Sequence, residues 1–187
     1  MDKMAWGVLS TAKIGLQKVI PAMQKGRHSR IVAIASRDMA KARDAAVRLS
    51  ITRAHGSYEA LLGDPDIQAV YIPLQNHLHV QWSVQALEAD KHVLCEKPIG
   101  LDAEQARQLQ AAAHRHPHLK VMEAFMYRFH PQWIETRKLV ADGRLGELRS
   151  IQTFFSYYNV DPANVRNKPD IGGGGMLDIG CYCVSLS

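Results

Sequence analysis

Short apolar runs alternate with longer amphipathic stretches over most of this chain. Apolar runs of this length predict strands, whereas stretches with apolar residues every three or four positions predict helices. Strands alternating with helices are typical of a doubly wound α/β fold built on a parallel sheet. The expected strands are residues 4–9, 30–36, 53–55, 69–72, 92–95 and 120–123, and the expected helices are residues 13–25, 39–49, 58–62, 77–89, 102–116 and 131–142.

The pattern changes after the last of these helices. Residues 143–146 predict a turn, and residues 147–158 predict a strand that is longer than those before it, with alternate side chains on one face. A run of four glycines at 172–175 precedes a further expected helix. We therefore expect a first domain over residues 1–123. Residues 124–187 would hold a linking helix and the incomplete opening of a second, α+β domain with an open sheet.

The turn between the first strand and the first helix has the position of a phosphate-binding loop. It runs from Gly7 to Gly15, with Ser10 and Ala12 where the usual fingerprint has glycines. Small side chains still allow a pyrophosphate to approach the backbone and the helix N-terminus, which predicts a Rossmann dinucleotide site. Taken alone, this loop also fits an ordinary strand–turn–helix connection. The loop residues expected to touch the cofactor are Ser10, Thr11, Ala12, Lys13 and Ile14.

The end of the second strand bears on the choice of cofactor. Ser36 and Arg37 stand where an acidic residue would bind the ribose 2′-hydroxyl of NAD. A hydroxyl and a guanidinium suit a 2′-phosphate instead, so the sequence favours NADP. Asp38 follows directly and leaves NAD possible, and Arg37 also fits a solvated residue at a strand end.

Composition and charge exclude several other functions. The formal net charge is +5, but basic and acidic residues are interspersed, which does not predict a nucleic-acid surface. There is no apolar run of membrane-spanning length and no basic, apolar leader, so we expect a cytoplasmic protein without a membrane partner. Three cysteines without zinc spacing predict reduced thiols and no metal site.

Four further segments lie in the order and spacing of one enzyme family. They are residues 70–79, 91–98, 123–131 and 172–182. With them, the chain resembles the Gfo/Idh/MocA oxidoreductases, and within these the dimeric dihydrodiol dehydrogenase and D-xylose dehydrogenase subgroup. The resemblance implies a nicotinamide-dependent oxidoreductase of sugars or vicinal diols that forms a homo-oligomer at full length. Members run to nearly twice this length, so we expect the chain to lack most of its substrate domain.

The resemblance also assigns site residues. Tyr182 would exchange the proton of the substrate hydroxyl, the Lys97 ammonium would favour its phenolate form, and Asp178 would orient the substrate. Lys97 is the alternative proton acceptor. The residues implied to line the nicotinamide side of the cofactor or the adjoining active site are Pro73, Leu74, Asn76, His79, Glu96, Lys97 and Arg128.

Two other functions are also compatible with the sequence. A dinucleotide-binding module without catalysis would fit the altered glycine loop and the short chain. Nucleic-acid binding has only the basic balance in its favour. Without the resemblance, Tyr182 would be read as a core residue and Lys97 as a surface ion-pair partner.

Overall fold

The computed structural model describes residues 2–187, which form two compact units, the first ending at Glu123 and the second running over Ala124–Ser187. The first unit contains one sheet of six strands in the order β3-β2-β1-β4-β5-β6, and every neighbouring pair is parallel. The strand order reverses between β1 and β4, which is where doubly wound sheets bind ligands. The strands are β1 (Met4–Leu9), β2 (Ser29–Ala35), β3 (Arg53–His55), β4 (Ala69–Ile72), β5 (His92–Cys95) and β6 (Val121–Glu123). The predicted Rossmann sheet is confirmed.

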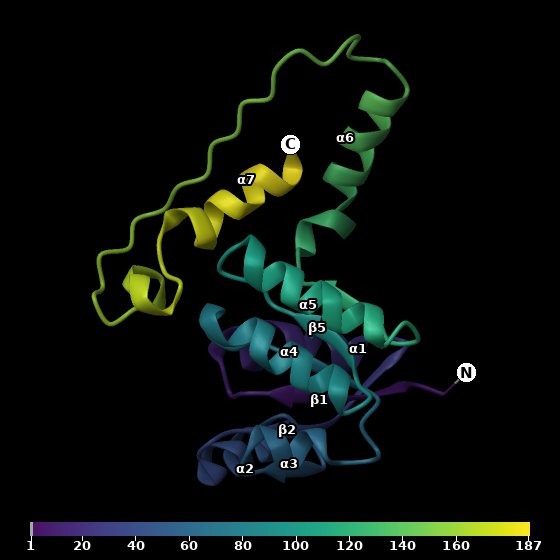
Figure 1. The fold of residues 1–187 in the computed structure, drawn as a ribbon, viewed down its shortest axis with the longest axis vertical. Coiled ribbons are helices and arrows are strands. Elements are labelled where there is room, and N and C mark those ends of the chain that lie inside the picture. The colour runs from purple at the N-terminus through teal and green to yellow at the C-terminus, as the bar shows by residue number, and fades with distance from the viewer. Residues whose placement is uncertain (1) are drawn as a thin grey trace. The chain divides into compact units, whose positions relative to one another are not determined.

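Helices cover both faces of this sheet and close two separate apolar cores. Ile20 and Ala45, from α1 and α2, pack with Val8 and Ile34 in one core. The other core collects the buried residues of α3, α4 and α5. The helices, labelled in Figure 1 where there is room, are α1 (Ile20–Lys25), α2 (Met39–Arg48), α3 (Tyr58–Leu62), α4 (His79–Glu88) and α5 (Ala103–Arg115).

Side-chain caps fix where three of these helices begin. Asp38 accepts hydrogen bonds from the amides of Ala40 and Lys41 at the start of α2. Ser57 and Asp102 cap α3 and α5 in the same way. Such caps satisfy N–H groups that have no partner inside the helix. The π-type turn Gly15–Val19 leads into α1, and the 3₁₀ turn Asn76–Leu78 leads into α4.

The second unit consists of helices and turns joined by irregular chain. It contains a 3₁₀ turn (Met126–Phe129), α6 (Pro131–Ala141), two further 3₁₀ turns (Val165–Asn167 and Pro169–Ile171), a π-type turn (Met176–Gly180) and α7 (Cys181–Leu186). The expected turn at 143–146 is present, with positive φ at Gly143 and Gly146. The helix expected after the glycine run is also present.

The strand expected over residues 147–158 is wrong. This segment has no regular secondary structure, and no strand among residues 2–187 pairs with it. Phe154 and Tyr158 are almost fully exposed. Alternating apolar and polar residues allow a strand, but the strand forms only when a neighbour supplies the hydrogen-bonding ladder.

Candidate dinucleotide and catalytic site

Ser10 organises the loop that follows β1. Its hydroxyl donates a hydrogen bond to the carbonyl of Pro73 (3.1 Å) and accepts one from the amide of Ala12 (3.2 Å). Its own amide bonds to the carbonyl of Ala35 at the end of β2 (3.0 Å). The φ of Ser10 is 119°, a region that favours glycine and costs other residues about 1–3 kcal/mol. The two side-chain bonds offset this strain and tie the loop to the segment after β4.

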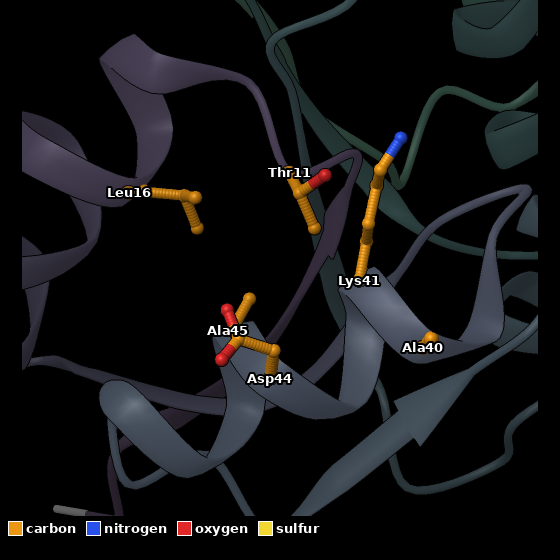
Figure 2. Close-up of a pocket in the computed structure, with 6 residues that line it drawn as sticks. All are labelled: Thr11, Leu16, Ala40, Lys41, Asp44 and Ala45. Carbon is orange, nitrogen blue, oxygen red and sulfur yellow. The ribbon is translucent and has the colours of Figure 1, made fainter.

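A hollow of about 300 Å³ lies beside this loop, between it and α2. Thr11 and Lys41 stand on the same side of the hollow in Figure 2. Lys13 and Ile14, at the start of the helical segment, are exposed. The residues that line the hollow are Thr11, Leu16, Ala40, Lys41, Asp44 and Ala45.

At the end of β2, the acidic residue that comes first in the sequence, Asp38, is already engaged. Ser36 is buried, and its hydroxyl accepts a hydrogen bond from the amide of Asp38 (3.2 Å). The Asp38 carboxylate caps α2 and lies 3.6 Å from the ammonium of Lys41. The hydrogen bond from the Lys41 amide is the main cause of a lowered pKa at Asp38, and the lowered pKa keeps the capping carboxylate ionised. Arg37 and Lys41 are both exposed, so this segment offers two cations to a ligand. Sequence reasoning missed Lys41, although its place in the first turn after Arg37 was a usable signal.

Tyr71 in β4 holds the carboxylate that follows β5. Its side chain is fully buried, and its hydroxyl donates a hydrogen bond to Oε1 of Glu96 (2.5 Å). Burial, together with the Glu96 charge, keeps the pKa of Tyr71 far above its ordinary value. The phenol is therefore always protonated and always a donor. Tyr71 was missed because a tyrosine in an apolar run predicts only core packing.

His79 connects the segments that follow β4 and β5. The imidazole is fully buried, with Nδ1 2.7 Å from the carbonyl of Pro98 and Nε2 3.0 Å from the carbonyl of Leu74. Burial lowers the pKa of His79. Because the side chain is fully buried, it contacts the backbone of these two segments and has no surface exposed to a ligand. Leu74 and Asn76 are half-buried beside it.

Lys97 lies in the first unit, half-buried after β5, and its peptide bond to Pro98 is cis. The amide of Ile99 donates a hydrogen bond to Oε1 of Glu123 at the end of β6 (2.7 Å). Sequence analysis gave Glu123 no side-chain role, because nothing in the local pattern shows that a carboxylate on β6 reaches a loop after β5.

Asp178 and Tyr182 lie in the second unit, on either side of the junction between the π-type turn and α7. The Asp178 carboxylate, 11% exposed, accepts hydrogen bonds from the hydroxyl of Tyr157 and from Nε of Arg166 (2.9 Å). The hydrogen bond to Asp178 raises the pKa of Tyr157. Arg166 and Tyr157 therefore fix the carboxylate that the resemblance assigns to substrate orientation.

The ring of Tyr182 packs in an aromatic group of the second unit. Its centroid lies 5.1 Å from Phe125 in an edge-on arrangement and 6.0 Å from both Tyr127 and Phe155. Such contacts orient a phenol ring without using its hydroxyl. Arg128 is exposed in the turn Met126–Phe129 of the same unit.

Two further features concern residues 2–187. No group of three or more histidine, cysteine, aspartate or glutamate side chains there has the geometry of a metal site. None of the helices in that range is both long and apolar enough to cross a membrane.

Comparison with known proteins shows the family of this chain. Residues 4–125 match the model of an oxidoreductase family with an NAD-binding Rossmann fold, and residues 133–187 match the C-terminal domain model of the same family. Fold and sequence thus define a Rossmann-type oxidoreductase family. The chain belongs to the Gfo/Idh/MocA family, as the four segments predict.

Individual relatives share most of this chain. It is 45% identical to D-xylose 1-dehydrogenase (NADP(+)) 2 of Haloferax volcanii, over 98% of this chain and 56% of the relative. It is 38% identical to trans-1,2-dihydrobenzene-1,2-diol dehydrogenase of Xenopus laevis, over 97% of this chain and 54% of the relative. The crystal structure of KijD10, a 3-ketoreductase from Actinomadura kijaniata in complex with NADP and TDP-benzene, superimposes with a TM-score of 0.88 at 37% identity, covering 97% of this chain and 55% of that one. The chain spans about half the length of these proteins.

Proposed function

We propose that this chain is the cofactor-binding portion of an NADP-dependent oxidoreductase that acts on a hydroxyl or carbonyl group of a sugar or vicinal diol. In this proposal, residues 1–123 bind NADP, and residues 124–187 belong to a substrate and dimerisation domain. The relatives support this assignment, since one is an NADP-dependent xylose dehydrogenase, one is a diol dehydrogenase and one is a ketoreductase seen with NADP.

The observation that carries the proposal is the chemistry at the end of β2. An NAD site needs a free carboxylate there to accept a hydrogen bond from the ribose 2′-hydroxyl. Asp38, the carboxylate that directly follows Arg37, is used as the cap of α2. A 2′-phosphate would instead meet the guanidinium of Arg37 and the ammonium of Lys41. The hollow beside this loop is lined by Thr11 and Lys41, which could donate to a phosphate, and also by the carboxylate of Asp44.

The catalytic roles are those that the family resemblance assigns. NADP, when bound, would supply the hydride acceptor at C4 of its nicotinamide ring. Tyr182 removes the proton of the substrate hydroxyl, and the Lys97 ammonium lowers the barrier by stabilising the phenolate. Asp178, held by Tyr157 and Arg166, orients the substrate hydroxyls.

The remaining cofactor contacts complete the assignment. Pro73, Leu74, Asn76 and Glu96 would surround the nicotinamide and its ribose. Arg128 would lie near the active site, and the full protein would act as a homo-oligomer in the cytoplasm.

Calorimetric titration with NADPH and NADH tests the cofactor claim. We expect NADPH to bind more tightly, and Arg37→Ala or Lys41→Ala to weaken NADPH binding about tenfold while changing NADH little, because each removes one charge-assisted contact to phosphate. Ser36→Asp is expected to reverse the preference. Lys25→Ala, an exposed lysine at the end of α1, is the matched control. Equal affinity for both cofactors, or no binding by a chain that circular dichroism shows to be folded, refutes the NADP assignment.

Hydride transfer tests the catalytic claim. The assay follows NADPH absorbance with pentoses, hexoses and cyclic vicinal diols, in the longest polypeptide that the gene encodes. Lys97→Ala and Tyr182→Phe are each expected to lower kcat by about 100-fold or more while leaving NADPH affinity within a fewfold. Turnover that persists in both variants excludes the proposed acid–base pair.

A further inference from the structure

The backbone around Lys97 is anchored on both sides by side chains from neighbouring elements of the first unit. We call residues 96–99 the Lys97 loop. Its first residue is held by β4, since the Glu96 amide donates to the carbonyl of Ile72 (3.1 Å) and the Glu96 carboxylate accepts from Tyr71. The residues that follow Lys97 need their own anchors, because no strand continues beyond Cys95.

His79 supplies the anchor on Pro98. The ring lies at the start of α4, fully buried, with Nδ1 2.7 Å from the Pro98 carbonyl. Its other nitrogen faces the carbonyl of Leu74, so one ring spans the segments after β4 and β5. A buried polar ring has a large desolvation cost unless it is hydrogen-bonded. The neutral imidazole has one N–H, and the shorter distance favours Nδ1–H as the donor to the Pro98 carbonyl. The loop therefore has little freedom to move away from α4.

Glu123 supplies the anchor on Ile99. Its Oε1 accepts a hydrogen bond of 2.7 Å from the Ile99 amide. A carboxylate that accepts from a backbone amide makes a stronger bond than a neutral acceptor does. Glu123 is the last residue of β6, which pairs with β5 in parallel register, so the sheet itself fixes its position.

We propose that His79 and Glu123 are positioning residues for Lys97: together they hold the Lys97 loop in one backbone conformation and so direct the lysine ammonium. The physical need is clear, because a lysine side chain has four flexible carbons and large rotamer freedom. Its ammonium can have a defined place only if the Cα is fixed. A misplacement of about 1 Å is enough to lower a rate about 100-fold. The catalytic consequence, though not the anchoring itself, rests on the proposed function.

The anchoring is tested by NMR on the 187-residue chain, without substrate. The variants are Glu123→Ala and His79→Leu, which remove the anchors, and Glu123→Gln and His79→Asn, which keep an acceptor for Ile99 and a donor for Pro98. In the wild type, we expect slow exchange of the Ile99 amide and two distinct signals for the Hε protons of Lys97, as for a fixed side chain. Glu123→Ala should raise the Ile99 exchange rate at least tenfold and merge the two Hε signals, whereas Glu123→Gln should resemble the wild type.

The catalytic consequence is tested by kinetics on the longest encoded polypeptide. Glu123→Ala and His79→Leu are expected to lower kcat at least tenfold, with the Kd of NADPH changed less than threefold. The assay temperature is kept well below the thermal midpoint of each variant, so that unfolding does not contribute to the loss. The conservative variants should recover most of kcat. A residue with only a structural role would instead lower stability, cofactor affinity and kcat together, with no recovery that follows the hydrogen-bonding group.

Each of these results either supports or overturns the proposed positioning of Lys97. Unchanged Hε signals and Ile99 exchange in both anchor-removing variants overturn the proposal, as does a kcat within twofold of the wild type. If the wild type transfers no hydride to any sugar or diol, the proposed function fails, and the NMR result still decides whether the two side chains position Lys97.

Discussion

Gly7 lies within β1 and Gly15 begins the π-type turn that leads into α1, and the structure predicts opposite effects when each is changed to alanine. At Gly7, an added Cβ would lie 2.6 Å from Cδ2 of Leu61 and 3.0 Å from Cδ1 of Ile67, both fully buried. At Gly15, the nearest atom would be Cγ of Pro73 at 3.4 Å, which is an ordinary contact. Gly7 is therefore needed for packing against α3, and Gly15 has room for a methyl group.

The magnitudes follow from packing and backbone entropy. Overpacking a tight core costs about 1–3 kcal/mol, and replacing glycine within a strand returns at most about 1 kcal/mol. Gly7→Ala should thus lower the unfolding free energy by about 1–2 kcal/mol. Gly15 has a helical backbone, so Gly15→Ala should raise the unfolding free energy by about 0.5–1 kcal/mol.

Urea unfolding followed by tryptophan fluorescence measures the difference. In a Trp133→Phe background, the two remaining tryptophans, Trp6 and Trp82, report on the first unit alone. The midpoints of the two glycine variants should differ by about 1 M urea. If Gly7→Ala is as stable as its parent, or if Gly15→Ala is the less stable of the two, the assignment of Gly7 to packing is refuted.

Three further perturbations give defined outcomes. Asp102→Ala should lower the melting temperature by about 4 °C by removing the cap of α5, and Asp102→Asn should restore it. Burial lowers the pKa of His79, against the contacts with the carbonyls of Pro98 and Leu74, which raise it, so the unfolded state binds more protons below about pH 6.5. The unfolding free energy should therefore fall as the pH drops below that value, and His79→Asn should flatten this slope in pH-dependent urea titrations. Tyr71→Phe should lower the unfolding free energy by about 1–2 kcal/mol in the same assay, since it removes a hydrogen bond to a carboxylate, and an unchanged midpoint would show that water replaces the phenol on Glu96.

Local sequence patterns were sufficient for the parallel sheet. The runs at 4–9, 69–72 and 92–95 become strands with the expected bounds, because buried apolar residues flanked by turns have few other stable arrangements. The pattern at 147–158 is equally regular, yet it forms no strand. A strand depends on a neighbour distant in sequence, and the local pattern carries no information about whether that neighbour is present.

The candidate site shows the same division. The position of Lys97 after a strand could be predicted, since the carboxyl ends of parallel strands share one edge of the sheet. The carboxylate that accepts from the Ile99 amide and the imidazole that contacts the Pro98 carbonyl could not be predicted, because they come from β6 and α4. Asp38 is the opposite case, because an aspartate directly before a predicted helix is a candidate cap from the sequence alone. This capping role makes its carboxylate unavailable to the ribose of NAD.

The burial of Cys95 has a practical consequence for labelling. The thiol lies at the end of β5 with no exposed surface, and burial raises its pKa far above the ordinary range, so it forms almost no thiolate. The two other cysteines, Cys181 and Cys183, are both half-buried in α7. A maleimide dye applied to the native chain should therefore attach to α7 alone. Fluorescence from that dye would report on the second unit when NADPH is added to the first, with no cysteine removed from the sequence.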